Sequence, residues 1–204
     1  MSITAPRVFS YKVVRDLGFA PNPFYGVCTL ACCKPDIRDA AEPGSLVIGT
    51  GGQTNGLLGR LIFAMEVAEK LTFTQYWEDE RFAIKKADMD AGLRAGYGDN
   101  IYHKDAIGNW MQALSHHSFE DGSLNVANLQ RDTSTDAVLI GSNFVYWGSL
   151  APEVPTHLQN FEGDDLRPRG RADRSRFSDA MREAVFDWFS AIPTRGYLAR
   201  PSGW

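Results

Sequence analysis

The segment from Arg60 to Glu69 constrains the fold most, because its side chains alternate in character along RLIFAMEVAE. Every second position holds a large apolar residue and the positions between are mostly charged or small; the apolar set is Leu61, Phe63, Met65 and Val67. A period of two is typical of a β-strand that buries one face. The segment therefore predicts a long strand within a sheet.

Further segments supply neighbouring strands. Runs rich in β-branched and aromatic residues predict strands at Val8–Arg15, Leu46–Thr50 and Ala137–Trp147. Pro43-Gly44 predicts the turn into the second of these, and the stretch Gly51–Gly56 predicts a flexible connection back to the alternating strand. We expect an α+β fold with a small mixed or antiparallel sheet of about four to six strands.

Helices are expected to flank this sheet. Thr72–Gln75 has the form of a capping box before Tyr76-Trp77. Ser178 is placed to cap a C-terminal amphipathic helix that Pro193 ends, with one apolar stripe made of Met181, Ala184, Val185, Trp188, Phe189 and Ile192.

Three regions are less regular. Thr29–Ala41 has a helical start that Pro35 divides, and Lys85–Gly98 predicts a loop. Asp105–Ser115 has helical spacing that Gly108 weakens. No repeat and no linker divides the chain, so we expect a single α+β domain over residues 1–204.

Composition excludes several classes of protein. With 44% hydrophobic and 12% aromatic residues, the chain is expected to be globular rather than disordered. It has no apolar run near the roughly 20 residues that a membrane span needs, and its first residues lack the apolar core of a signal peptide. We therefore expect no membrane partner and a cytoplasmic location.

The three cysteines, Cys28, Cys32 and Cys33, are odd in number and clustered. That pattern argues against a disulfide framework. Their spacing is not that of a usual zinc knuckle, and no second cysteine pair follows. The sequence therefore predicts small buried thiols, with no metal and no cofactor.

Charge is distributed unevenly. The net charge of −4 gives no basic footprint for nucleic acid over the whole chain. Between Leu166 and Arg182, however, two aspartates face six arginines and no lysine; the arginines are Arg167, Arg169, Arg171, Arg174, Arg176 and Arg182. Arginine suits recognition of phosphate or carboxylate, whereas a solvated loop with ion pairs explains the same composition. Both interpretations stay open.

The middle of the chain predicts a ligand site. Tyr97–His103, Trp110, Gln112 and Ser115–Ser118 bring together three of the four histidines, a carboxylate, amides, hydroxyls and aromatic rings. This mixture of titratable, hydrogen-bonding and stacking groups lacks the fixed apolar period of a core segment. It favours a pocket for a planar, polar ligand.

Each residue in this region has a functional and a structural interpretation. Tyr102 and Trp110 offer stacking faces, or core packing. Asp99 and Asn100 offer polar groups that suit a base edge, or they stabilise a turn. His103 and His117 are the candidates for general acid–base chemistry, with Asp16 as a further proton-transfer candidate, although each histidine is also explained as a satisfied structural residue.

The chain resembles the nucleotide modification associated domain type 2 family. The resemblance rests on a series of motifs in order, namely Tyr11-Lys12 with Arg15-Asp16-x-Gly18-Phe19-Ala20-Pro21-Asn22-Pro23-Phe24, then Cys33-Lys34-Pro35-x-Ile37-Arg38, Tyr76-Trp77-x-Asp79-x-Arg81-Phe82, Gly98–His103, Ser115-x-His117-Ser118 and Asp136 with Leu139–Gly148. The chain departs from the family at Arg171–Ser175, where Gly-His-Arg-Ser is expected.

This resemblance implies a ligand class rather than a reaction: nucleotides or modified bases, in prokaryotic or phage DNA hypermodification and anti-phage conflict. The candidate ligand-binding residues are Tyr11, Lys12, Arg15, Asn22, Asp99, Asn100, Tyr102, Trp110, Ser115, Arg171 and Arg174. The order of strands and the Lys-Pro-x-Ile-Arg element also resemble PUA-like barrels, a likeness of fold that carries little about function.

Four functions are compatible with these observations. The first is binding of a nucleotide or nucleobase, free or in DNA. The second is an enzyme that acts on the same ligand. Its mechanism is not indicated, because the sequence has no Gly-x-Ser-x-Gly, His-Glu-x-x-His or zinc-deaminase motif. The third is a phage protein that sequesters a nucleotide immune signal, and the fourth is a protein-interaction module. The sequence leaves room for an oligomer.

Overall fold

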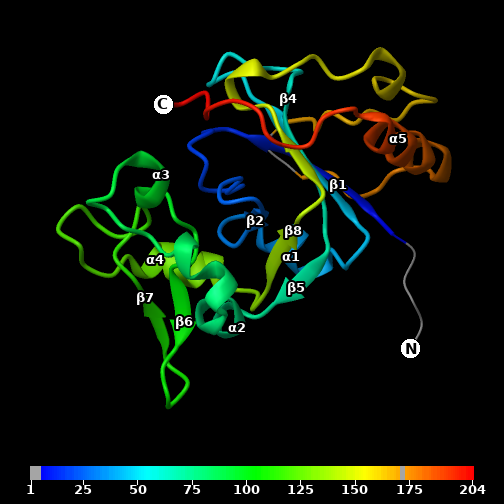
Figure 1. Ribbon diagram of the computed structural model, residues 1–204. Coiled ribbons are helices and arrows are strands. Elements are labelled where there is room, and N and C mark those ends of the chain that lie inside the picture. The colour runs from blue at the N-terminus through cyan, green and yellow to red at the C-terminus, as the bar shows by residue number, and fades with distance from the viewer. Residues whose placement is uncertain (1–5, 171–172) are drawn as a thin grey trace. The chain divides into compact units, whose positions relative to one another are not determined.

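A computed structural model describes residues 6–170 and 173–204 (Figure 1). The chain divides into two compact units. The first unit comprises Met1–Leu17, Ala41–Ala68 and Gly141–Trp204, and the second comprises Gly18–Ala40 and Glu69–Ile140. The prediction of one domain over residues 1–204 stays a prediction, because two compact units can belong to one domain.

The first unit is built on a five-stranded mixed sheet in the order β1-β3-β4-β9-β10. Its strands are β1 (Val8–Val13), β3 (Leu46–Gly51), β4 (Leu61–Glu66), β9 (Phe144–Tyr146) and β10 (Gly196–Tyr197). β1 and β3 run parallel, as do β9 and β10, while β4 is antiparallel to both of its neighbours. The alternating segment Arg60–Glu69 therefore supplies a central strand of the sheet, but a shorter one than predicted, since it ends at Glu66 and Glu69 begins a strand of another sheet.

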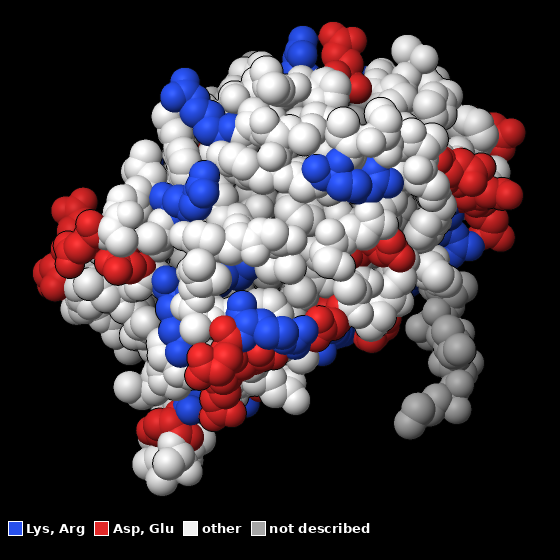
Figure 2. All heavy atoms as spheres, in the orientation of Figure 1, with Lys and Arg blue, Asp and Glu red and all other residues white. Residues whose placement is uncertain are grey.

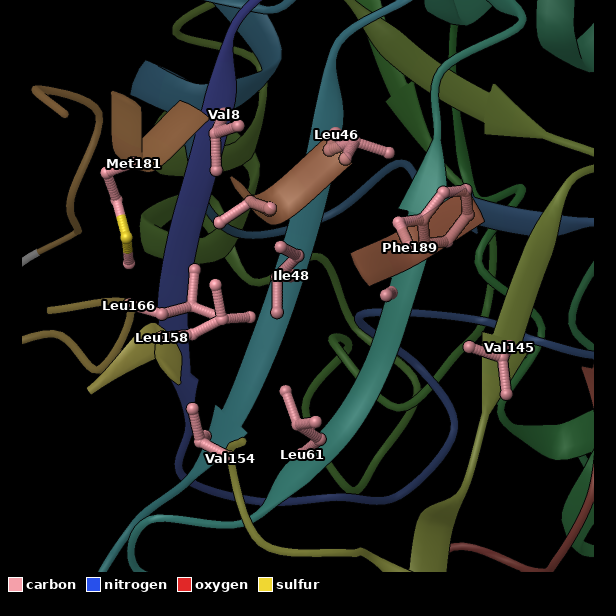
Figure 3. Packing of buried hydrophobic residues seen from close by; sticks show 12 residues of the cluster. Val8, Leu46, Ile48, Leu61, Val145, Val154, Leu158, Leu166, Met181 and Phe189 are labelled. Carbon is pink, nitrogen blue, oxygen red and sulfur yellow. The ribbon is translucent and has the colours of Figure 1, made fainter. Parts of the chain in front are cut away.

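Helix α5 (Asp179–Ala191) covers this sheet through the predicted stripe. Ser178 caps it as expected, since its hydroxyl accepts a hydrogen bond from the backbone N–H of Met181 at 3.2 Å. Met181, Val185 and Phe189 are buried in one cluster with residues of the strands, as Figure 3 shows for ten labelled members. Two short 3₁₀ turns, Gly148–Leu150 and Thr156–Leu158, complete this unit's helical elements among the described residues.

The second unit holds smaller elements around two sheets. One sheet has the order β2-β8-β5, from Cys28–Leu30, Val138–Gly141 and Glu69–Leu71, and the other pairs β6 (Tyr102–Lys104) with β7 (Trp110–Gln112). Its helices are α1 (Pro35–Ala40), α2 (Phe73–Glu78), the 3₁₀ helix η1 (Glu80–Lys85), α3 (Leu93–Gly96) and α4 (Val126–Asp132).

Several predicted elements are confirmed. The capping box before α2 is present, because the Thr72 hydroxyl accepts from the Gln75 N–H at 3.2 Å and the Gln75 amide oxygen accepts from the Thr72 N–H at 2.9 Å. Pro35 does divide its segment: it stands at the first position of α1, where its missing N–H costs nothing. The α+β fold itself is confirmed.

Other predictions were wrong. The segment Asp105–Ser115 is a hairpin rather than a helix, because the Asp105 carboxylate accepts from two turn amides and Gly108 adopts a positive φ of 89°. The expected loop Lys85–Gly98 contains α3. The expected strand Ala137–Trp147 is two strands, β8 and β9, in different sheets. The described sheets are open, so the barrel alternative does not hold.

No described helix combines the length and the apolar character required to cross a bilayer. Basic and acidic side chains are interspersed on the face that Figure 2 draws, without a large patch of one sign.

We expect Phe189→Ala to lower the free energy of unfolding by about 3–5 kcal/mol, since the phenyl ring is 2% exposed and its loss leaves a cavity under α5. Glu183→Ala, on the exposed side of the same helix, is the control and should change stability by less than about 0.5 kcal/mol. Urea unfolding measures both. Equal effects of the two substitutions would contradict the packing described for α5.

Candidate functional site

A cluster of four polar side chains is buried in the second unit. Asp132 is the last residue of α4, Tyr102 begins β6, Cys32 follows β2, and His117 lies in the loop between β7 and α4. His117 is 9% exposed and the other three are fully buried. Four separate segments thus contribute one reactive or ligating group each to the same interior position.

Asp132 is the centre of this cluster. Its Oδ2 lies 2.7 Å from Nδ1 of His117 and accepts a hydrogen bond from the Tyr102 hydroxyl at 3.0 Å. Its Oδ1 accepts from the backbone N–H of Cys33 at 2.9 Å. Burial by itself would raise the pKa of Asp132, but the His117 and Cys33 hydrogen bonds and the charge of Arg131 lower that pKa below its ordinary value.

The Cys32 thiol completes the cluster. A carboxylate oxygen of Asp132, a ring nitrogen of His117 and the Cys32 sulfur all lie within 4.8 Å of one another. The thiol also lies 3.7 Å from the backbone carbonyl oxygen of Asp99, to which it donates. Burial raises the pKa of the Cys32 thiol well above its usual range, so the free thiol is neutral and a poor nucleophile.

The loop that carries His117 is held by its own polar residues. Ser115, predicted as a ligand residue, is buried and accepts the His117 N–H at 3.3 Å through its hydroxyl. Asn128 donates to the His117 carbonyl at 2.9 Å, and the Phe19 ring lies 4.5 Å from the imidazole, measured between ring centroids. These contacts fix the position of the imidazole and give Ser115 a supporting role.

Arg38 fixes the backbone around the cluster. Its guanidinium is fully buried and donates to the carbonyl oxygens of Cys33 at 2.7 Å, Asp132 at 2.5 Å and Ala137 at 2.5 Å. Burial lowers the pKa of Arg38 below its usual value. No sequence pattern indicates a functional role for Arg38, yet its hydrogen bonds hold the backbone of Cys33 and Asp132 at one point.

Asp99 and Asn22, both predicted to bind ligand, lie in a second buried network. Lys85 donates to the Asn22 side-chain oxygen at 2.8 Å and to the Thr29 hydroxyl at 3.1 Å. The Asp99 carboxylate accepts from Thr29 at 2.6 Å and from Tyr76 at 2.8 Å. With these partners inside the protein, the geometry favours structural roles for Asp99 and Asn22.

Burial affects both charges of this network. Desolvation lowers the pKa of Lys85 to about 8, against the opposing effect of Asp99. Desolvation also raises the pKa of Asp99, although Lys85, Thr29 and Tyr76 oppose that shift. Each charge is therefore costly to bury and depends on the other.

Asn100, Tyr102 and Trp110 belong to the interior or its edge. Asn100 is buried and its amide donates to the carbonyls of Tyr76 at 2.9 Å and Phe82 at 3.2 Å. Tyr102 is 0% exposed, so the face of its ring is closed to a base. Trp110 is half-buried, and Lys104 lies 4.5 Å from its ring centroid.

His103 lies apart from His117. Its ring stacks on Trp77 with centroids 4.1 Å apart and an interplanar angle of 13°. Burial and the nearby Lys86 lower the pKa of His103 below its ordinary value, which favours the neutral ring. Its Nδ1 is buried and has no hydrogen-bond partner among the residues that the structure describes.

Asp16 and Tyr11 belong to the first unit. The Asp16 carboxylate accepts from the Tyr146 hydroxyl and from the backbone N–H of Ser202, which ties the C-terminal segment to this position. Tyr11 is 2% exposed and packs edge-on against Phe63.

The predicted basic residues are placed differently from one another. Arg15 is exposed. Arg174 forms an ion pair with Asp164 and lies over the ring of Phe177. Arg171 lies outside the described residues.

Lys12 lines a pocket in the first unit with a volume of about 400 Å³. The other lining residues are Thr50, Gly51, Leu58, Gly59, Asp165, Arg167, Pro168 and Arg169. Lys12 and Thr50 are paired near the carboxyl ends of the parallel strands β1 and β3, a usual place for ligand sites in open sheets. The pocket therefore brings three cations and one carboxylate together.

The chemistry of this pocket suits an anion. Arg167 is held by Asp165 through two hydrogen bonds of 2.9 and 2.6 Å, which lower the pKa of Asp165 and raise that of Arg167. Lys12 and Arg169 form no ion pair within the described parts of the chain, and so remain available to a ligand. Gly51 leaves no room for a side chain, because a Cβ there would lie 2.2 Å from the Leu57 carbonyl oxygen.

A family model, nucleotide modification associated domain 2, matches residues 5–204. The chain belongs to this family. The match covers the strands of both units, and it confirms the resemblance found from the ordered motifs. We found no match among curated proteins and none among solved structures. Membership in the nucleotide modification associated domain 2 family connects the chain with nucleotide modification at the level of the family description.

Sequence reasoning missed Asp132, Lys85 and Arg38. No motif or periodicity marks Asp132, which stands in a short polar helix. Lys85 and Arg38 have the type of residue that usually lies at the surface, so only their burial reveals their roles.

In this family member, we expect Lys85→Met to destabilise the fold by about 3–5 kcal/mol, because it leaves the buried Asp99 carboxylate uncompensated. Adding Asp99→Asn to that variant should recover part of the loss, and chemical denaturation of the single and double variants measures it. Lys86→Met, at the neighbouring half-buried lysine, is the control and should cost about 1 kcal/mol or less. If the losses of unfolding free energy in Lys85→Met and Asp99→Asn simply added in the double variant, the coupling between Lys85 and Asp99 would be contradicted.

Proposed function

We propose that the protein binds a nucleotide, free or within DNA, and that the pocket of the first unit holds its phosphate. The observation that carries the proposal is the convergence of Lys12, Arg167 and Arg169 on one pocket of about 400 Å³. This volume lies within the range of about 300–1,000 Å³ that is usual for small-molecule sites.

The cations of the pocket are suited to phosphate in complementary ways. Arg167 is already oriented by Asp165 at 2.6 Å, so little rotamer entropy is lost when its remaining donors meet a ligand. Lys12 extends from a strand, and Arg169 from the arginine-rich segment. Charge-assisted hydrogen bonds from both residue types are the usual means of holding phosphate.

The family description favours a nucleotide among phosphate-bearing ligands. The setting that we propose is prokaryotic or phage DNA modification, or anti-phage conflict, inside the cell. Binding without turnover would correspond to a reader of modified bases or to sequestration of a nucleotide signal.

We expect Lys12→Ala and Arg169→Ala each to weaken the binding of a deoxynucleoside monophosphate about tenfold or more, since a hydrogen bond to a charged group contributes about 1.5–3 kcal/mol. Isothermal titration calorimetry measures the affinity. The matched control is Arg176→Ala, an exposed arginine of the same segment that does not line this pocket. An unphosphorylated nucleoside that binds as tightly as the nucleotide, or an equal loss in the control, would exclude the phosphate site.

A second candidate function is acid–base chemistry on a nucleotide at His117. The specific observation is the 2.7 Å contact between its Nδ1 and the Asp132 carboxylate. A carboxylate at one ring nitrogen sets the tautomer and orientation of an imidazole, and leaves Nε2 to exchange a proton with a substrate. An enzyme of this kind would act on the same class of ligand, a nucleotide, that the binding proposal names.

For this candidate we expect His117→Gln to lower nucleotide turnover about 10²–10⁴-fold, which is the usual contribution of a positioned acid or base. Mass spectrometry of nucleotides and of DNA digests after incubation measures the turnover. His157→Gln, at an exposed histidine of the first unit, is the control. Turnover that is unchanged in His117→Gln would eliminate this role.

A further inference from the structure

Cys32, His117 and Asp132 form a donor set that the phosphate proposal does not use. They supply one sulfur, one imidazole nitrogen and one carboxylate oxygen, and these atoms lie within 4.8 Å of one another. We propose that the three residues bind one divalent transition-metal ion of the zinc class in the interior of the second unit.

The types of ligand decide the class of metal. A thiolate and an imidazole are soft or borderline ligands that suit Zn²⁺, Co²⁺ and Fe²⁺, whereas Mg²⁺ and Ca²⁺ prefer oxygen ligands only. Three protein ligands with a fourth position left for water are usual in catalytic zinc sites. Cysteine, histidine and aspartate at one buried point match that pattern.

The geometry requires only small movements. With metal bonds of about 2.0–2.3 Å in a tetrahedral site, ligand atoms lie about 3.3–3.6 Å apart. The His117 Nδ1 and Asp132 Oδ2 are now 2.7 Å apart, so an ion would separate them by about half an ångström. No pair in the set is farther apart than 4.8 Å, which is about 1.2–1.5 Å beyond the tetrahedral spacing.

Tyr102 adds a fourth polar group beside the ion. Its hydroxyl lies 3.0 Å from Asp132 Oδ2 and 3.4 Å from His117 Nδ1. A hydroxyl in this place is positioned to donate to a ligating carboxylate or to a metal-bound water. The aromatic ring itself is anchored edge-on against Phe73, with centroids 5.5 Å apart.

The surroundings resemble the supporting hydrogen bonds of metal sites, which orient the ligating groups. The carboxylate oxygen of Asp132 that would not bind the ion, Oδ1, accepts from the Cys33 N–H at 2.9 Å. Asn128 donates to the backbone carbonyl of His117. Cys33 and Lys34, directly after Cys32, both have positive φ angles, of 60° and 43°. Backbone of this kind is costly for residues other than glycine and concentrates at functional sites.

Charge is balanced by the ion. A deprotonated Cys32 and Asp132 would place two negative charges in the interior beside the buried Arg38 guanidinium. A divalent cation offsets the two ligand charges, and burial of unpaired charge is otherwise strongly unfavourable.

The test is Co²⁺ binding to the full-length protein after treatment with a chelator, in the absence of nucleotide. We expect one Co²⁺ per chain, a thiolate-to-cobalt charge-transfer absorption, and displacement of Co²⁺ by Zn²⁺. Cys32→Ser should abolish the charge-transfer band, and Asp132→Asn should weaken affinity at least tenfold. Cys28→Ser is the matched control, because Cys28 is equally buried but outside the donor set.

A second measurement covers variants that fail to fold. The melting temperature of the unmodified protein should rise with Zn²⁺ concentration and stay unchanged with Mg²⁺, since a ligand that binds only the folded state stabilises it. No charge-transfer band, loss of the band in Cys28→Ser, or no thermal shift with Zn²⁺ would overturn the proposal. Since no nucleotide is present, these outcomes are independent of phosphate binding. Bound metal would make His117 a ligand rather than a free base.

Discussion

The hydrogen bonds of the buried Arg38 guanidinium are the interaction on which the arrangement of the second unit depends. It donates to carbonyl oxygens of three segments, at Cys33, Asp132 and Ala137. An arginine inside a protein is tolerated only when its donors are satisfied, so these three segments cannot separate without a large free-energy cost. The end of α4, the beginning of β8 and the turn after β2 are consequently held at one point. That constraint is what places Cys32 beside Asp132.

The first unit reaches its candidate site by a different route. Its pocket depends on two parallel strands that end side by side, where Lys12 faces Thr50. Parallel pairing aligns the carboxyl ends of strands that are distant in sequence, and Gly51 at the end of β3 lines the pocket together with Leu58 and Gly59. The arginines arrive on a loop that Leu166 anchors in the core. Backbone pairing therefore positions the pocket of the first unit, whereas a buried side chain positions the cluster of Cys32, His117 and Asp132.

The structure also separates residues that the sequence grouped by composition. The polar segment around Asp99 and His117 contains one network that ends at Lys85 and another that ends at Asp132. In the Lys85 network the donors and acceptors bond to one another inside the protein, and burial makes the charges of Lys85 and Asp99 depend on each other. The second brings a thiol and an imidazole to one carboxylate. Polar residues in a ligand-like mixture thus serve stability in one case and candidate chemistry in the other.

Patterns along the chain predicted the local elements: a strand in the alternating segment Arg60–Glu69, which is β4 over Leu61–Glu66, the capping box at Thr72 and the stripe of α5. These follow from periodicity and from contacts between residues three or four apart. Residue type also made His117 and Lys12 candidate site residues. Only the tertiary structure brought Asp132 to His117 and Arg167 to Lys12. Such pairings depend on loop closure and on which charges become buried, and neither leaves a pattern along the chain.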